Sequence, residues 1–417
     1  MSAEELYRNL QRCQWLGAAE LVELTAASEA RIRAHAAATT AFYRAHEPGR
    51  LVTTKADLRE HGIRAFFSDD IPPDHGAVSP HWTSGSSGEP IEIRRTELCD
   101  RMVKLANIRF FEAFRPDWRR SLARIREGFP GTSPYPDGAR GKGTWVPPWV
   151  ASECGPVVKL DLATPVDRQL MWLERQGPLY LNTFPSNLRA LALVQLDCPR
   201  SIDMGAVITV GEPVTSDLRA LVRRAFDCEI YDQYSSTEGL LIASQCPAST
   251  YLHVQSELVK LEILRPDESP AGLGEEGDVV VTPLVNFAMP LIRYRLEDRA
   301  AWRGTCGCGR GHPLISVEVG RERHLFRFDD GSIVFPMIRT QEFMDYLKAT
   351  RWQVAQTSPR SVEVRFSSAA DPGARDYAAM TRAVRSHLAH EVEVSYRLME
   401  TWPPSDSGKL PECIREF

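Results

Sequence analysis

Hydrophobic residues along this chain follow helical spacing in some stretches and form strand-like runs in others. Helical spacing predicts helix from residue 1 to about 46 and again at 97–114. Further along, apolar runs that suit strands alternate with turns and helical stretches, and these runs fall at 178–182, 206–210 and 228–231. The β-branched run at 206–210 is typical of a strand buried on both faces. This alternation predicts an α/β domain whose ligands lie beyond the carboxyl ends of the strands.

The pattern changes after about residue 250. Short strands separated by turns predict a β-rich subdomain, with strands at 258–264, 278–282 and 291–295. After Gly320 a helical stretch at 376–390 stands between strand-like runs, which predicts a small α+β domain. We therefore expect a large N-terminal domain over residues 1–320 and a small C-terminal domain over residues 321–417.

The composition is that of an ordinary globular protein, since 43% of the 417 residues are hydrophobic and 25% are charged. No run of about 18 apolar residues is present, so we expect no membrane span. The formal net charge of −5 argues against nucleic acid as a partner. The acidic N-terminus leads into no signal-like apolar run, and the nine scattered cysteines make a poor disulfide framework. Together these features predict a cytoplasmic location.

A Ser/Gly-rich segment offers the first candidate chemistry, with six consecutive small residues: Thr83, Ser84, Gly85, Ser86, Ser87 and Gly88. Glycines let the backbone approach a ligand closely, and hydroxyl and N–H groups suit a phosphate chain. The segment is not a Walker loop, because no Gly-Lys-Ser/Thr ends it. It is either a flexible linker or a phosphate-binding loop. The strand-like alternation directly after Pro90 weakens the linker interpretation.

Three further polar segments carry candidate residues. One follows the strand at 228–231 and combines a ring that can stack on a base with hydroxyls and a possible Mg²⁺ ligand: Tyr234, Ser235, Thr237 and Glu238. Taken alone, a surface loop is the simpler interpretation of this segment. Asp298 follows an apolar strand, where it can accept ribose hydroxyls or pair with the adjacent arginines. Lys409 lies in a Pro- and Ser-rich loop and is simply solvated unless that loop delivers it into a site.

Four residues have the character of metal ligands. Cys246 and His253 lie seven positions apart, and Cys306 and Cys308 flank a glycine. Three thiols and one imidazole satisfy the tetrahedral preference of structural Zn²⁺. The alternative is that the cysteines pack as small hydrophobic residues. Core packing is a poor explanation for Cys306 and Cys308, because their segment is polar and rich in Arg and Gly, so we predict a zinc site.

The order of these motifs is more specific than any one of them. Along the chain stand TSGSSGEP at 83–90, GEP at 211–213, YSSTE at 234–238, YRLED at 294–298, GR at 320–321 and GK at 408–409. As a set they resemble the adenylate-forming superfamily, which includes acyl-CoA synthetases, luciferases and nonribosomal adenylation domains. The stretches LVTTKADL at 51–58 and PLIRY at 290–294 narrow the resemblance. From about residue 30 to the end, the chain is similar to the phenylacetate-CoA ligase family.

The resemblance implies a role for each nucleotide-site residue. The loop at 83–88 would hold the β- and γ-phosphates of ATP. Gly211, Glu212 and Tyr234 would border the adenine, with Pro213 and Ser235 in the same two nucleotide-binding motifs. The remaining roles fall to residues later in each motif: Thr237 at the α-phosphate, Glu238 on Mg²⁺, Asp298 on the ribose hydroxyls, Arg321 near the ribose, and Lys409 bridging carboxylate and α-phosphate. Family members also carry zinc at the positions of the three cysteines and the histidine.

The implied reaction activates a carboxylic acid. A carboxylate oxygen attacks the α-phosphorus of ATP, which gives an acyl-AMP and releases pyrophosphate. Charge builds up on the phosphorus oxygens, so Lys, Mg²⁺ and hydroxyl donors are the useful groups. A second partner, often coenzyme A, then attacks the acyl carbonyl. The small domain would rotate between the two steps about a hinge at 320–321.

Three departures from the family pattern leave the second step open. Arg323 and His324 stand where two acidic residues are common, Ile333 replaces an Asn, and Glu89 stands where a Lys is common. We therefore hold three hypotheses: a CoA ligase acting on an aryl or arylalkyl acid, an enzyme that passes the acyl group to an amine, hydroxyl or carrier-protein thiol, and a catalytically silent scaffold. Aromatic candidates for the acid pocket are Trp82, Trp145, Trp149, Tyr180 and Phe184. Analogy with relatives implies a homodimer.

Overall fold

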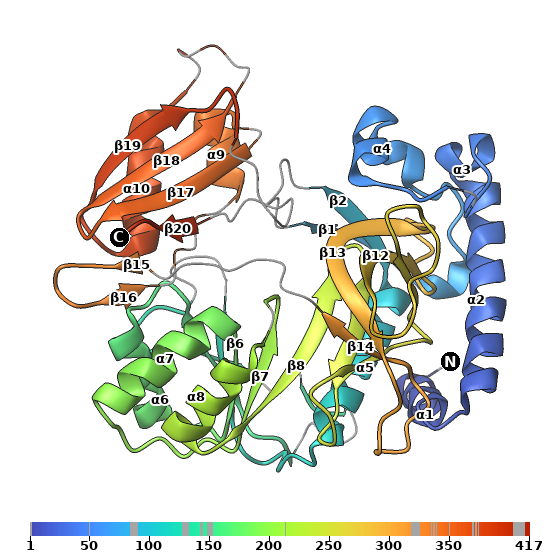
Figure 1. The fold of residues 1–417 in the computed structure, drawn as a ribbon, viewed down its shortest axis with the longest axis horizontal. Coiled ribbons are helices and arrows are strands. Elements are labelled where there is room, and N and C mark those ends of the chain that lie inside the picture. The colour runs from blue at the N-terminus through green and yellow to red at the C-terminus, as the bar shows by residue number, and fades with distance from the viewer. Residues whose placement is uncertain are drawn as a thin grey trace.

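The computed structural model describes the chain except for residues 1, 50, 84–90, 127–132, 142–144, 148–152, 213, 318–325, 335, 337, 339, 350, 369, 370, 372, 374 and 403–412, and it gives the backbone alone for residues 297, 340, 341 and 351. Within the described part, one twelve-stranded sheet runs through the larger portion of the molecule. This architecture confirms the predicted α/β class. Figure 1 shows the sheet with helices on its flanks and a separate unit at the C-terminal end.

One half of the large sheet is parallel. Its strands, in sheet order, are β8 (Glu229–Ser236), β7 (Ala206–Val210), β6 (Tyr180–Thr183), β3 (Leu122–Arg126) and β5 (Val157–Asp161), and the short β4 (Ala139–Gly141) closes the edge antiparallel to β5. Every residue of β7 is buried, as its apolar run predicts. Three helices cover one face of these strands (Figure 1): α6 (Val166–Gln176), α7 (Pro185–Asp197) and α8 (Ser216–Phe226).

The other half of the sheet is antiparallel and contains the predicted β-rich subdomain. From β8 outward the order is β9 (Leu240–Gln245), β10 (Leu252–Val254), β14 (Leu314–Val317), β13 (Tyr294–Arg303), β12 (Glu276–Pro283) and β11 (Val259–Leu264). The strand expected at 291–295 begins at Tyr294 instead, because Arg293 has a left-handed φ of 50° that interrupts extended backbone. Asp298 therefore lies within β13 and not at a strand end.

The N-terminal residues form several helices and not one long one. They are α1 (Ala3–Cys13), α2 (Ala18–Thr39), α3 (Ala41–Ala45), α4 (Lys55–Glu60), η1 (Ile63–Phe66) and η2 (Pro73–His75). Gly17 begins α2, and Thr40, in extended conformation, ends α2 and caps α3, so the expected helix over residues 1–46 is interrupted twice. A hairpin of β1 (Val78–Trp82) and β2 (Glu92–Thr96) then leads into α5 (Glu97–Ala113). Helix α5 matches the predicted range closely.

The C-terminal residues have their own hydrophobic core. Helices α9 (Thr340–Leu347) and α10 (Tyr377–Leu388) pack with a four-stranded sheet whose order is β19 (Glu393–Leu398), β18 (Ser361–Ser367), β17 (Arg351–Ser358) and β20 (Cys413–Arg415). A hairpin of β15 (Phe326–Arg327) and β16 (Ile333–Val334) joins this core. The boundary at 320–321 lies outside the described residues, so the division into two domains and the mobility of the smaller one stay predictions.

Among the described residues, no helix has both the length and the apolar character needed to span a bilayer. Thr215 occupies the N-cap position of α8, but its hydroxyl makes no capping bond to the helix backbone. Instead the Thr215 hydroxyl accepts a bond from Arg189 (3.1 Å), which also pairs with Asp217 in the first turn of α8.

Candidate active site and metal centre

Tyr234 and Asp298 meet in space although three strands separate β8 from β13 in the sheet. The Tyr234 hydroxyl donates to Asp298 Oδ2 at 2.8 Å. In a flat sheet these two strands would be about 19 Å apart, so the sheet curls to bring them together. Both residues lie at a shift of strand register. In the β8–β9 pair the shift falls between Tyr234 and Ser235. In the β12–β13 pair it falls between Asp278 and Val280 of β12, opposite the part of β13 that contains Asp298. Such bulges re-aim side chains, and here they aim a phenol and a carboxylate at each other.

Glu238 completes this group. Burial, the Asp298 carboxylate and the nearby Glu238 charge all raise the pKa of Tyr234 well above its usual value, which shows that Glu238 lies within electrostatic reach of the ring. Tyr234 therefore stays protonated and remains a hydrogen-bond donor. The fold brings together three of the residues predicted from the YSSTE and YRLED motifs.

The hairpin that carries the Ser/Gly segment is fixed next to this group. At its neck the Thr83 backbone N–H donates to the Ile91 carbonyl (3.1 Å), and the Ile91 N–H donates to the Thr83 hydroxyl (2.9 Å). On β2, Arg95 donates from Nη2 to the Thr237 carbonyl at 2.5 Å. On α5, Asn107 accepts from Gln233 at 2.8 Å. The hairpin and its helix thus hold the segment from Gln233 to Thr237 at both ends, a link that no motif indicated.

Gly211 and Glu212 follow the carboxyl end of β7. Gly211 has φ +86°, and a Cβ at this position would lie 3.1 Å from the Phe184 ring, so both the backbone conformation and the close packing require glycine. Glu212 accepts from the Ser186 N–H (2.8 Å) and from the Ser186 hydroxyl (3.0 Å). It therefore caps the N-terminus of α7, where a carboxylate is favoured. Contact of these residues with adenine stays a prediction.

Several predicted site residues lie outside the described part of the chain: Ser84, Gly85, Ser86, Ser87, Gly88, Pro213, Arg321 and Lys409. Their implied roles in phosphate binding, ribose binding and catalysis are carried forward as predictions. Thr83, Ser235 and Thr237 are described and partly buried, and they belong to the segments discussed above.

A buried carboxylate that the sequence did not single out lies two residues before Tyr234. Asp232 accepts from the Thr209 hydroxyl at 2.8 Å, and its backbone N–H donates to Gln245. Burial raises the pKa of Asp232 to about 7, against the opposing effects of the Thr209 hydroxyl and Arg219. An acidic residue inside an apolar strand was the available signal, and the side-chain partner on β7 could not be read from the sequence.

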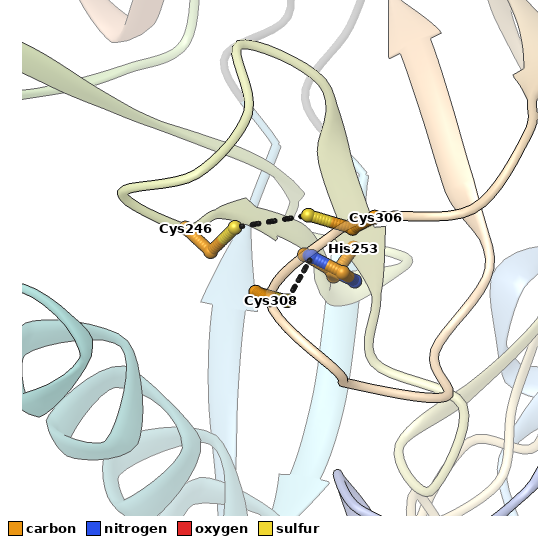
Figure 2. Close-up of side chains that lie close together, drawn as sticks. All are labelled: Cys246, His253, Cys306 and Cys308. Carbon is orange, nitrogen blue, oxygen red and sulfur yellow. Dashed lines mark hydrogen bonds between the residues drawn. The ribbon is translucent and has the colours of Figure 1, made fainter.

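The Cys/His cluster gathers the four predicted metal ligands (Figure 2). Cys246 follows β9, His253 lies in β10, and Cys306 and Cys308 lie in the connection from β13 to β14. The four ligand atoms all lie within 4.8 Å of one another. Cys246 Sγ and Cys306 Sγ are 3.5 Å apart, and Cys308 Sγ lies 3.4 Å from His253 Nε2. Two sulfurs on a tetrahedral Zn²⁺ would be roughly 3.8 Å apart, and a disulfide would need about 2.05 Å.

Neighbouring groups prepare the cluster for a metal. His253 Nδ1 lies 3.1 Å from the His312 carbonyl, so it donates there as N–H and leaves Nε2 free of a proton. Burial lowers the pKa of His253 to about 4, which keeps the ring neutral. Burial acts to raise the pKa of Cys308, but bonds from Arg310 and the neighbouring thiols outweigh it and lower the pKa overall. A neutral imidazole and a thiol with a lowered pKa suit zinc ligation, whereas burial raises the pKa of Cys246 to about 12.

A buried ionic network supports this cluster from behind. Arg109 on α5 pairs with Glu257, and Glu257 Oε2 lies 3.0 Å from His312 Nε2. Burial acts to raise the pKa of Glu257, but Arg109 and His312 outweigh it and bring it to about 2. Arg109 also donates to the Leu10 carbonyl of α1. The network therefore ties α1 and α5 to the loop that carries Cys306 and Cys308, and no sequence pattern predicted it.

Comparison with known proteins gives a consistent result. No protein-family model matches the chain. Phenylacetate-coenzyme A ligase of Thermus thermophilus is 24% identical over 279 residues, which cover 64% of this chain and 59% of that protein. Two crystal structures of 2-hydroxyisobutyryl-CoA ligase are each 17% identical to this chain. The structure in complex with 2-HIB-AMP and CoA in the thioesterification state gives a TM-score of 0.63, covering 97% of this chain and 92% of that one. The structure of an open conformation of the same ligase gives a TM-score of 0.59, and the match covers 97% of this chain and 94% of that one.

The chain has the fold of the adenylate-forming CoA ligases, and over 64% of its length its sequence is similar to the phenylacetate-CoA ligase of Thermus thermophilus. The fold match extends over nearly the whole chain, including the C-terminal unit. The match to the Thermus protein spans 59% of its length.

Proposed function

We propose that this phenylacetate-CoA ligase-like chain is an enzyme that uses ATP and Mg²⁺ to convert a carboxylic acid to an acyl-adenylate and pyrophosphate. The observation that carries the proposal is the contact of Tyr234 with Asp298 within the adenylate-forming fold, with Glu238 four residues after Tyr234 and close enough to influence its pKa. These residues supply an aromatic surface for a base, a Mg²⁺ ligand and an acceptor for ribose hydroxyls. Such a group suits a nucleotide, and it lies at the carboxyl-end side of the parallel strands, where α/β folds bind ligands.

The remaining residues have roles consistent with that chemistry. The Ser/Gly loop at 84–88 would bind the β- and γ-phosphates, and Lys409 would approach the α-phosphate from the C-terminal unit. No side-chain nucleophile is needed, because the acid's own oxygen attacks phosphorus and pyrophosphate leaves. The protein's contribution is therefore to orient the two reactants and to neutralise charge on the phosphorus oxygens.

We further propose that the Cys/His cluster holds a structural Zn²⁺. Cys246, His253, Cys306 and Cys308 offer four ligands at suitable separations, and this donor set has no open position for a substrate. Its role would be to fix the connection between β13 and β14, the strand pair that includes Asp298.

Coenzyme A is the proposed acyl acceptor, and its thiol would displace AMP to give a thioester. A second candidate, transfer to an amine, hydroxyl or carrier-protein thiol, is supported by one observation. Ile333, which replaces an Asn of the family, lies on β16 and packs against the apolar cluster of α6, α7 and α8. A residue used for packing in this way makes no polar contribution to thiol delivery. We propose an aromatic or arylalkyl acid as substrate, a homodimeric state and a cytoplasmic location.

The test is pyrophosphate release measured across a panel of carboxylic acids, with and without CoA. Acid-dependent release that CoA converts to thioester supports the CoA ligase. Acid-dependent release with an acyl-AMP that CoA does not consume supports the second candidate. If no acid of the panel causes release from zinc-replete protein, the proposed activity is wrong and the scaffold hypothesis replaces it.

A further inference from the structure

A cation without a partner lies inside the parallel half of the sheet. Arg124 is in the middle of β3 and is partly buried, and its Nε is fully buried with no hydrogen-bond partner. Throughout the described ranges, no hydrogen bond or ion pair joins Arg124 to any other group. Burial and the positive charge of Arg126 both lower the pKa of Arg124, so its surroundings disfavour the charge it carries. An unpaired guanidinium in such a place is costly unless something else supplies the anion.

Strand register shows what surrounds this arginine. Lys159, Arg124, Asn182, Ile208 and Tyr231 are paired in turn across β5, β3, β6, β7 and β8, so their side chains share one face of the sheet. Asn182 is buried and donates from Nδ2 to the Ile208 carbonyl at 3.1 Å. None of the five carries a negative charge, and Lys159 adds a second positive one.

The same face carries an aromatic layer. One step nearer the start of the strands, Leu122 and Tyr180 pack with Trp145 in a single apolar cluster. The Trp145 and Tyr180 ring centroids are 5.4 Å apart, and the buried Trp145 Nε1 has no acceptor among the described residues. Among the described residues, two donors without a partner, one of them charged, therefore stand on a face that also carries aromatic rings. Buried donors normally form hydrogen bonds in a folded protein, so the lack of acceptors for these two groups needs an explanation.

This face also leads to the candidate nucleotide site. Arg124 lies two residues, about 7 Å, before the carboxyl end of β3. At the end of that strand Arg126 lies over the Phe184 ring, which also packs against Gly211. An acid lying on this face would extend from the aromatic layer toward the strand ends, where its reacting carboxylate would meet the α-phosphate.

We propose that Arg124 is a specificity-determining residue that selects an aromatic acid bearing a second carboxylate, distant from the one that is activated. Arg–carboxylate pairs form two parallel N–H···O bonds, which match the guanidinium that the fold leaves unpaired. The inference rests on the proposed function for the identity of the ligand as an acid substrate. It adds the requirement that the substrate brings the missing negative charge.

The test measures binding, which does not require turnover. Calorimetric titration would compare mono- and dicarboxylic acids on the same skeletons, such as benzoate against isophthalate and terephthalate, with the wild type and Arg124→Met. The wild type should bind at least one dicarboxylate about 10-fold more tightly than the matching monocarboxylate. Arg124→Met should weaken dicarboxylate binding by ~10- to 100-fold. Its affinity for the monocarboxylate should stay within about 3-fold of the wild-type value. Arg140→Met is the matched control, because Arg140 is exposed on β4 and faces the opposite side of the sheet.

Thermal unfolding supplies a second readout. Removal of an unpaired charge should raise the melting temperature of Arg124→Met, whereas an arginine that stabilises the fold would give a lower one. Equal binding of mono- and dicarboxylates by the wild type, or equal weakening of both by Arg124→Met, would overturn the inference. The inference would also be overturned if Arg124→Met weakened the binding of CoA and left the binding of the acids unchanged. Arg124 would then bind the phosphates of the acceptor.

Failure of this inference and failure of the proposed function give different results. Selective dicarboxylate binding without pyrophosphate release would retain the role of Arg124 and reject the adenylating activity. Pyrophosphate release without selectivity for a second carboxylate would retain the activity and reject the role of Arg124.

Discussion

The Cys/His cluster and the nucleotide site each gather residues from distant parts of the chain, but the described structure completes them to different degrees. The cluster has its four ligand atoms within 4.8 Å, and its histidine tautomer is set by a backbone carbonyl. The proposed nucleotide site has Tyr234 and Asp298 in contact, whereas the proposed phosphate loop and Lys409 belong to segments outside the described residues. The four residues of the cluster all lie in described segments, whereas the proposed nucleotide site also needs segments outside the described residues.

The largest effect should come from the nucleotide site itself. Glu238→Gln removes the proposed Mg²⁺ ligand, so charge on the phosphates is neutralised less well, and acid-dependent pyrophosphate release should fall by ~10³-fold. Glu229→Gln is the matched control, because Glu229 begins β8, the strand that precedes Glu238, and is exposed. A variant of Glu238 that keeps wild-type activity would remove this residue from the site.

The next effect tests the metal centre. Cys306→Ser should lower the zinc content from about one per chain to nearly none and reduce the free energy of unfolding by roughly 3 kcal/mol or more, because metal binding stabilises only the folded loop. Elemental analysis and urea unfolding measure these two quantities. Cys198→Ser should change neither, since Cys198 is exposed and distant in sequence from the cluster. Wild-type protein that holds no zinc when grown with it would contradict the assignment.

A third effect depends on pH. Burial raises the pKa of Asp232 to about 7 from an ordinary value of 3.8. Between those values the folded chain keeps a proton that the unfolded chain releases, so the stability from this group is present below about pH 4 and is lost as pH rises to about 7. Relative to Asp232→Asn, the wild type should therefore lose about 4 kcal/mol of stability between pH 4 and pH 7.5. Parallel pH profiles for the two proteins would show that Asp232 is ionised when folded.

The smallest effect isolates the contact between the two halves of the sheet. Tyr234→Phe keeps the ring but removes the hydroxyl that donates to Asp298. KM for ATP should rise about 5-fold, equivalent to about 1 kcal/mol, with little change in kcat. If the hydroxyl acts through Asp298, the double variant with Asp298→Asn should cost less than the sum of the two single variants. Strict additivity would show that the hydrogen bond does not couple the residues.

Local patterns and ordered motifs predicted much of what the structure contains. The buried run at 206–210 became β7, the helical spacing at 97–114 became α5, and the four metal ligands came together as proposed. The strand and the helix share a cause, because each depends on residue type and spacing within a short segment, whereas the metal ligands were predicted from their residue types and polar surroundings. The interruption of the first helix was missed, because the apolar spacing continues across Gly17 and Thr40.

The features that the sequence did not reveal depend on contacts between distant segments. Asp298 was expected at a strand end, but it lies within β13 at a register shift that faces Tyr234. Glu212 was assigned to adenine, and its helix-capping contact with Ser186 follows only from the position of α7. The unpaired state of Arg124 required knowledge of every neighbouring strand. A side chain's partners, and the lack of them, are properties of the fold and not of any local pattern.

The central claim is that this chain joins a carboxylic acid to AMP at a site completed by the C-terminal unit. Its most direct test is acid-dependent exchange of labelled pyrophosphate into ATP, measured for the wild type and for Lys409→Ala with the acid that gives the highest pyrophosphate release. The account predicts clear exchange in the wild type and its loss in the variant, while the variant still transfers the acyl group from a preformed acyl-AMP. Exchange that is absent from folded wild-type protein, or equal in both proteins, would contradict it.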